Sequence, residues 1–199
     1  CSYQHQTSLA LIHMPDMSSI EAWTTYDGAP PDTKGHGLNF GAPGRRIDPD
    51  SGSVWHAQAG NLYRHASAIK ERNDALDWVA ASTWELDNGD DNTIEIKGLL
   101  HVSYKVRFHF AELQKDVAPG ERVFDVLVNG EEVLTAFDIV ARAGGCFRAV
   151  VEACSIECDG TMRIALRKKN GSTRNPLING IELIATDARM AAATPLFSR

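Results

Sequence analysis

Hydrophobic and polar positions alternate with a period of two over residues 102–110. Apolar side chains at every second position are separated by Ser103, Lys105, Arg107 and His109. This period is typical of a β-strand that buries one face and leaves the other in water. The segment therefore predicts an antiparallel sheet with one solvated face, a scaffold well suited to presenting a binding surface.

Turn-forming dipeptides divide the second half of the chain into short apolar runs. Asn129-Gly130 is the strongest of these signals, because the type I′ turn of a two-residue hairpin needs two residues that tolerate positive φ. Similar dipeptides begin at Pro119, Gly144, Asp159 and Asn170. The runs between them predict strands over residues 93–97, 102–110, 122–128, 132–137, 147–157, 161–167 and 177–185. This spacing indicates an all-β fold, an antiparallel β-sandwich or jelly roll.

The other segments differ in composition from this strand-rich half. Tandem prolines at Pro30 and Pro31 favour extended backbone and indicate a linker. Between the linker and the strands the chain is irregular, and residues 66–78 are compatible with one short helix. We therefore divide the chain into an N-terminal extension with its linker, a β-sandwich domain and a C-terminal tail, over residues 1–34, 35–186 and 187–199.

Composition excludes several classes of protein. The chain has 199 residues, of which 43% are hydrophobic, and a formal net charge of -6. A mildly acidic chain lacks the basic face that nucleic acids need, so we expect no nucleic-acid partner. We expect no membrane span, because no run of about 18 apolar residues occurs. No secretory leader is recognised at the start, and we interpret the chain as an excised piece of a longer protein.

The cysteines indicate free thiols more than a disulfide framework. If residues 147–157 form a strand, Cys154 and Cys158 lie about 13 Å apart along the backbone. A disulfide needs Cα atoms within about 7 Å, so these two are not expected to bridge. Their spacing is not a zinc signature either. A disulfide that involves Cys1 or Cys146 stays open.

No motif for catalysis, metal or cofactor binding is present. The seven histidines show neither H-x-H nor H-E-x-x-H spacing, and the chain has no G-x-S-x-G elbow and no phosphate-binding glycine loop. The oxygen-rich stretches 48–52 and 87–92 lack the EF-hand pattern, so we interpret them as solvated turns. We therefore expect no metal, no cofactor and no enzymatic activity. A hydrolase or lyase is a minor alternative that would need two carboxylates meeting in one groove.

Two acidic residues lie inside predicted strands. Asp125 shares a strand face with Val123 and Leu127, and a carboxylate buried there is costly unless it is paired. We expect a partner such as Arg107 or Arg122. Asp138 is interpreted in the same way, as a structural residue.

Four sequence blocks carry a family resemblance. They are Leu38-Asn-Phe-Gly41, Phe108-His-Phe-Ala-Glu112, the segment from Arg122 through Asn129-Gly130 to Ile139, and Asn175-Pro-Leu-Ile-Asn-Gly-Ile-Glu-Leu183. In this order and at this spacing they resemble the malectin-like domain, a carbohydrate-binding β-sandwich of the galactose-binding-like type. The first 25 residues are similar to the tail that follows a quinoprotein-type β-propeller in some large bacterial proteins.

The resemblance implies recognition of a sugar by aromatic and polar loop residues at one end of the sandwich. The family's best-known member has an aromatic pair where this chain has Gln114 and Lys115, and Arg174 stands where a family aspartate contacts sugar. Stacking of a sugar ring on an indole requires polar groups fixed beside it. The candidate ligand-binding residues are Trp84, Tyr63, Gln114, Lys115, Arg174 and Asn175. The alternative is that Trp84 caps the core and the others are solvated loop residues.

These observations predict a non-catalytic carbohydrate-binding module of a larger bacterial protein. The partner would be an oligosaccharide or polysaccharide, and the location secreted, periplasmic or at the cell surface. Lys115 and Arg174 shift the site toward positive charge, which favours an anionic glycan such as a uronate or a sulfated polysaccharide. The alternative is an interaction or spacer module without sugar binding that contacts other domains of the parent protein.

Overall fold

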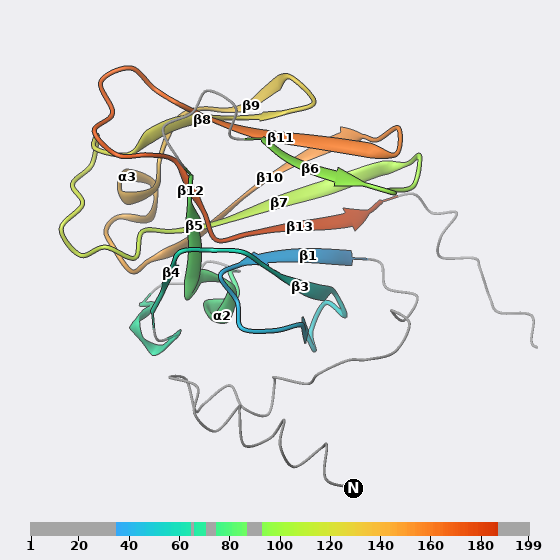
Figure 1. Cartoon of the computed structure of the whole chain (residues 1–199), viewed down its shortest axis with the longest axis horizontal. Helices are drawn as coiled ribbons and strands as arrows, with labels where there is room; N and C mark the ends of the chain where they lie inside the picture. Colours follow the sequence, from blue (N-terminus) through green and yellow to red (C-terminus); the bar gives the residue numbers. More distant parts are fainter. Residues whose placement is uncertain (1–34, 65, 71–74, 87–92, 187–199) are drawn as a thin grey trace, which may run out of the picture.

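The computed structural model describes residues 35–64, 66–70, 75–86 and 93–186, and Figure 1 shows two stacked β-sheets with a small third sheet at one end. The predicted extension 1–34, the tail 187–199 and the loop 87–92 lie outside the described residues. The predicted all-β sandwich is confirmed, and the proposed domain boundaries stay a prediction.

The larger sheet has six strands in the order β10-β7-β13-β1-β3-β2. They are β10 (Ala149–Glu157), β7 (Ser103–Ala111), β13 (Gly180–Ala185), β1 (Gly35–Phe40), β3 (Val54–Gln58) and β2 (Arg46–Ile47). All neighbours are antiparallel except β1 and β3, which are parallel. The expectation of a purely antiparallel sheet is therefore wrong for that one pair.

The second sheet has four strands in the order β6-β11-β8-β9, and a third sheet joins β12, β5 and β4. The four strands are β6 (Thr93–Lys97), β11 (Thr161–Lys168), β8 (Val123–Val128) and β9 (Glu131–Asp138). The small sheet contains β12 (Leu177–Ile178), β5 (Ser82–Glu85) and β4 (Leu62–Tyr63). The described helices are η2 (Ala66–Ala68), α2 (Asp77–Ala80) and α3 (Ile139–Ala143). The short helix compatible with residues 66–78 is replaced by η2 and α2, which lie at its two ends.

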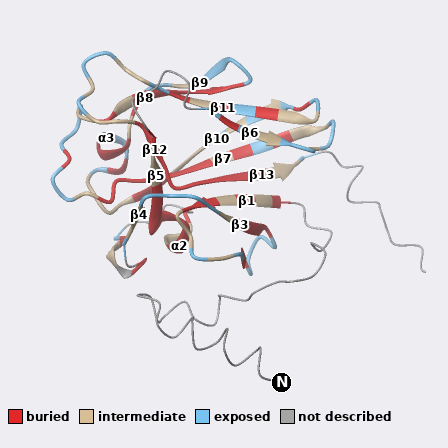
Figure 2. Cartoon of the chain, viewed as in Figure 1, coloured by how far each residue is buried: buried red, intermediate tan, exposed pale blue. Residues whose placement is uncertain are grey.

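The main core lies between the two larger sheets. Tyr104, Val106, Phe108 and Phe110 of β7 are buried there, as the period of two predicts. They pack with apolar residues of the second sheet such as Phe124, and Figure 2 shows buried residues along the facing strands. Full burial of each such side chain contributes about 1.5–3 kcal/mol to folding.

The other face of β7 is solvated over only part of its length. Lys105 is exposed, but His109 is fully buried, and its ring contacts the Trp55 ring at 5.2 Å between centroids. The predicted solvated face is therefore wrong at this end of the strand. The reason is a second apolar layer built from Trp55, Trp78 and Val79, which covers the sheet.

The predicted β8–β9 hairpin is confirmed. Asn129 and Gly130 have φ values of 51° and 88°, as a type I′ turn requires. At the far end of β9, the Asp138 carboxylate accepts the N–H of Ala141 at 3.0 Å and caps α3. Asp138 is therefore structural, as expected.

The partner predicted for Asp125 is wrong. Asp125 accepts a hydrogen bond from the N–H of Ala136 at 2.8 Å and pairs with Lys169 Nζ at 2.7 Å. Arg107 instead pairs with Glu182 on the outer face of the other sheet, and Arg122 lies at the loop end. Among the described cysteines, Cys146, Cys154 and Cys158 are free thiols.

Asn179 interrupts the strand predicted over residues 177–185 and joins three segments. This side chain is fully buried. Its Oδ1 accepts the N–H of Ala111 at 2.7 Å, and its Nδ2 donates to the carbonyls of Ser82 at 2.8 Å and Ala80 at 3.2 Å. The bonds hold β5 against the end of β7, so they fix the two segments that carry the loop-end polar residues.

The buried His109 makes stability depend on pH. Burial lowers the pKa of His109, and the nearby Arg107 lowers it further, although Glu182 and Asp48 oppose this effect. Its Nε2 lies 3.9 Å from Glu182 Oε2, too far for a hydrogen bond. The unfolded chain therefore binds a proton more readily than the native protein, and stability is lost as the pH falls below about 6.5.

We predict that unfolding free energy from urea titrations falls between about pH 7.5 and pH 5, by at most about 1.4 kcal/mol per pH unit for His109. His109→Phe keeps the ring contact with Trp55 and should flatten the slope, leaving only a contribution from His56, whose pKa burial also lowers. Glu182, with a pKa of about 2, titrates at lower pH. An unchanged slope in His109→Phe would contradict this assignment.

Candidate functional site

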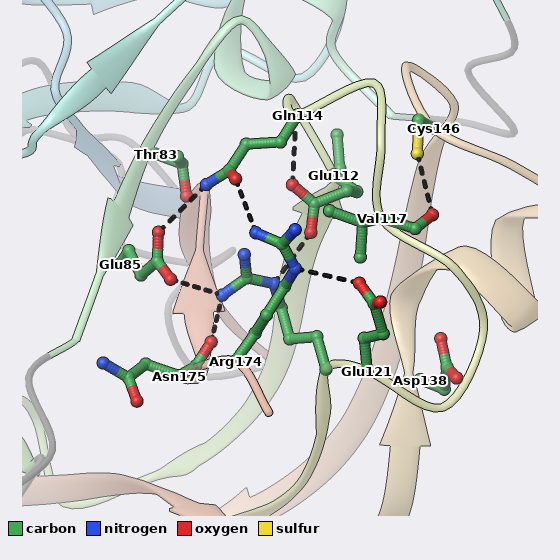
Figure 3. Close-up of polar contacts among 12 residues, drawn as sticks. Thr83, Glu85, Glu112, Gln114, Val117, Glu121, Asp138, Cys146, Arg174 and Asn175 are labelled. Carbon is green, nitrogen blue, oxygen red and sulfur yellow. Dashed lines mark hydrogen bonds and ion pairs between the residues drawn. The ribbon is translucent and has the colours of Figure 1, made fainter. Parts of the chain in front are cut away.

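The loops at one end of the sandwich bring several of the predicted residues together. The segment after β7, the start of β8, strand β5 and the loop before β12 converge there, and Figure 3 shows Gln114, Arg174 and Asn175 within one polar cluster. Glu85, Glu112 and Glu121 lie in the same cluster. We call these residues, together with Arg122, the loop-end cluster.

The buried centre of the loop-end cluster is the guanidinium of Arg122, which is 1% exposed. Its Nε donates to Glu112 Oε2 at 2.7 Å, and its Nη1 donates to Glu85 Oε1 at 2.9 Å and to the carbonyl of Asn175. Glu112 is fully buried, and its Oε1 accepts the N–H of Gln114 at 3.0 Å. Glu112 thus supports a loop amide, and Arg122 joins four segments.

A partly exposed second layer lies on this centre. Arg174 Nε donates to Glu121 Oε2 at 3.0 Å, and its Nη1 donates to Gln114 Oε1 at 2.7 Å. The amide nitrogen of Gln114 donates to Glu85 Oε2 at 3.2 Å. The hydrogen bond from Arg174 lowers the pKa of Glu121, and the same contact raises the pKa of Arg174. The layer therefore presents polar side chains whose positions are already set.

The expected positive charge of the site is largely balanced. Arg174 pairs with Glu121, and Arg122 pairs with Glu112 and Glu85. Lys115 is exposed, and no described residue forms an ion pair with it. The net charge of the site is therefore less positive than the sequence predicted, because that prediction counted Lys115 and Arg174 without the neighbouring carboxylates.

Trp84 lies apart from this polar cluster. Its ring stacks on Phe40 at 5.7 Å between centroids and packs against the main core. Neighbouring side chains of a strand point to opposite faces, so Trp84 points away from the side on which Glu85 meets Arg122. The indole is half-buried, so the capping alternative describes its packing well.

Tyr63 lies on β4, and Asn175 joins the loop-end cluster through its backbone. Tyr63 is half-buried on β4, opposite Ser82 in the register with β5. Asn175 contributes its backbone carbonyl to Arg122, while its side-chain Oδ1 accepts from Lys168 Nζ at 3.1 Å. Figure 3 shows this side chain pointing away from Gln114 and Glu112.

Sequence reasoning missed Arg122 and Glu85 as members of the cluster. Arg122 was expected only as a partner for Asp125. A carboxylate that is buried, as Glu112 is, requires a cation close by, and this requirement is the signal that points to Arg122. Among the described residues, no group of three His, Cys, Asp or Glu side chains is arranged to hold a metal ion. Within the same ranges, no helix has the length and hydropathy needed to cross a membrane.

Comparison with known proteins identifies the fold family. The Malectin-like domain matches residues 70–186. This chain belongs to the malectin-like family. This chain is 33% identical over 99 residues to Receptor-like protein 4 of Arabidopsis thaliana. The alignment covers 49% of this chain and 16% of that protein.

Solved structures agree with the family. The ANX2 ectodomain of Arabidopsis thaliana superposes with a TM-score of 0.64 and 18% identity, over 78% of this chain and 50% of that one. The structure of plant peptide RALF23 in complex with FER and LLG2 contains a chain that matches with a TM-score of 0.58 and 16% identity, over 77% of this chain and 48% of that one. These identities establish the fold alone. The malectin-like domain spans about half of these chains and a sixth of the receptor-like protein.

We predict that Arg122→Met costs about 3–5 kcal/mol of unfolding free energy, because it leaves Glu112 charged, buried and unpaired. Arg174→Met, which removes the exposed pair with Glu121, should cost much less. The double variant Glu112→Gln/Arg122→Met should recover part of the loss. Urea titration of the wild type and the three variants measures these losses of unfolding free energy, and equal losses for Arg122→Met and Arg174→Met would contradict the prediction.

Proposed function

We propose that this malectin-like domain is a non-catalytic carbohydrate-binding module that uses its loop-end cluster. The observation that supports the proposal is the fixed placement of Gln114 and Arg174 on the buried Arg122–Glu112 ion pair. Side chains held in place before binding lose little conformational entropy when a ligand arrives. Such fixed donors and acceptors match the closely spaced hydroxyls of a sugar.

We further propose that the preferred ligand is an anionic glycan such as a uronate oligosaccharide. The side chain of Arg174 is 30% exposed, and Lys115, which follows Gln114 in the sequence, is exposed as well. A carboxylate of the ligand would compete with Glu121 for Arg174 and would pair with Lys115. Hydrogen bonds between a guanidinium and a carboxylate are about twice as strong as neutral ones, so they favour a charged sugar over a neutral one.

Aromatic stacking enters the proposal in a reduced form. Phe40 covers part of the Trp84 ring, and Trp84 points away from the loop-end cluster, so stacking on the indole would reach only a sugar residue outside that cluster. Tyr63 would contribute from the neighbouring strand. The larger share of the binding free energy would come from hydrogen bonds to Gln114, Lys115 and Arg174. The segment at Asn175 lies next to these residues.

We predict that isothermal titration calorimetry with an oligogalacturonate detects binding by the intact chain, and that Arg174→Ala weakens it about tenfold or more. The matched control is Arg163→Ala, which removes a more exposed arginine that likewise pairs with a glutamate, Glu95 on β6. This control should bind like the wild type. Preference for a neutral glucan of the same length would reject the anionic ligand while leaving the glycan-binding module in place.

A second candidate is an interaction or spacer module without sugar binding. The specific observation in its favour is the structural neighbour that was solved in complex with a plant peptide and a further protein. The absence of heat from every glycan tested, with Trp84→Ala indistinguishable from the wild type, would favour this candidate. Both candidates place the malectin-like domain outside the cytoplasm, as one module of a larger protein. Attachment to a bacterial β-propeller stays a prediction, which the complete gene sequence would test.

A further inference from the structure

The outer edge of β10 is long and lacks the features that usually protect a sheet edge from pairing with another strand. β10 pairs with β7 over nine residues without a register shift, and no described strand pairs with its other side. Exposed edges invite pairing with another chain, and proteins usually protect them with lysine, proline, a bulge or short length. β10 has none of these features, since its only charged residues are Glu152 and Glu157.

The other sheet edges show the protection that β10 lacks. β2 has two residues, and β6 has five and ends in Lys97. β9 has eight residues, but its pairing with β8 has register shifts, and Ala136 adopts a φ of 48°. A bulge of this kind twists an edge away from incoming strands. Among the described strands, β10 is therefore the long edge that remains suitable for pairing.

The hydrogen-bond pattern shows which groups of β10 are available. The N–H of Cys158 donates to the carbonyl of Val102, in register with the β10–β7 ladder. Bonding residues alternate along an antiparallel pair, so the even-numbered residues of β10 bond to β7. The N–H and C=O groups of Val151, Ala153 and Ser155 consequently point outward. The backbone N–H of Lys70 donates to the carbonyl of Phe147, but Phe147 lies before the first residue of β10.

Two connected grooves run beside the end of this edge. One, of about 300 Å³, is lined by Val128, Asn129, Glu131, Ser155, Ile156 and Glu157. The other, of about 790 Å³, shares Asn129 and Glu157 and extends to Asp159 and Arg163. Added strands gain affinity from main-chain bonds and specificity from pockets for alternate side chains. The grooves supply such pockets next to the unpaired backbone.

The charge of the grooves indicates the kind of side chain that fits. Glu131, Glu157 and Asp159 are exposed there, and the single guanidinium, from Arg163, already pairs with Glu95 at 2.8 Å. A basic side chain of an added strand is therefore favourable over the grooves.

From these observations we infer that β10 is a docking edge for an extended, basic segment of a partner protein, which adds as a strand and places lysine or arginine at alternate positions over the acidic grooves. The acidic grooves are separate from the loop-end cluster. Ser103 pairs with Glu157 at the groove end of β7, whereas Glu112 follows the other end, about 30 Å away at 3.3 Å per residue. Binding of a basic side chain in the grooves therefore does not depend on the proposed glycan binding.

The inference is tested with nine-residue peptides selected from a random display library on the intact chain. We expect lysine or arginine at every second position, micromolar affinity by calorimetry, and at least tenfold slower hydrogen exchange of the Val151, Ala153 and Ser155 amides when peptide is bound. Ser155→Pro removes an outward N–H that β7 does not use, so it should retain the fold and weaken binding at least tenfold. Ser155→Thr, the matched control, should bind within twofold of the wild type.

Three results would overturn the inference. One is a selected peptide that binds Ser155→Pro and the wild type equally. Another is selection that enriches no basic peptide above background. The third is sedimentation showing that the wild type dimerises without peptide while Ser155→Pro is monomeric, because the occupant would then be a second copy of the chain. If Ser155→Pro does not fold, amide exchange of the wild type with bound peptide tests the inference instead. Slower exchange of the Val151, Ala153 and Ser155 amides would support it, and slower exchange only at other positions would overturn it.

Discussion

The ion pair between Arg122 and Glu112 is the contact on which the loop end of the domain depends. Both side chains are removed from water, and desolvation of two charges is costly unless all their hydrogen bonds are satisfied. Glu112 meets that condition by accepting from Arg122 and from the Gln114 amide. Arg122 meets most of it through Glu85 and the Asn175 carbonyl. The need to satisfy these charges thus holds four loops in one arrangement.

The same requirement gives the surface above the ion pair its shape. Gln114 and Arg174 are exposed in part, yet their positions follow from carboxylates fixed by the buried layer. Asn179 acts in parallel by bonding β5 to the end of β7 through its buried amide. A loss of either support would move the loops relative to one another, although neither Glu112 nor Asn179 is exposed to a ligand.

Much of the fold was predictable because its signals are local. The strands from β6 to β11 follow from a period of two and from dipeptides such as Asn129-Gly130, which specify a turn without reference to distant residues. The parallel pairing of β1 with β3 and the burial of His109 depend on the second apolar layer around Trp55. That layer comes from the irregular first part of the chain, where no period indicates which face a residue takes.

The candidate site was predictable to the extent that loops at one end of a sandwich converge. Gln114, Arg174 and Asn175 met for this reason. Trp84 lies on the other face of β5 from Glu85. This orientation could not be predicted, because β5 has only four residues and the alternation of its side chains is not visible in the sequence. The charge of the site could not be predicted either, since Glu85 and Arg122 are 37 residues apart and their pairing is a tertiary contact.

The two ends of the domain offer different kinds of recognition, and the distinction follows from how each end satisfies its polar groups. At the loop end, side chains carry out the pairing, so what remains for a ligand is a set of fixed side-chain donors and acceptors suited to small polar molecules. Along β10, backbone groups remain unpaired, and a row of such groups at strand spacing matches another polypeptide better than a sugar. The two proposed kinds of ligand would therefore use different groups of the same domain, side chains at the loop end and backbone along β10.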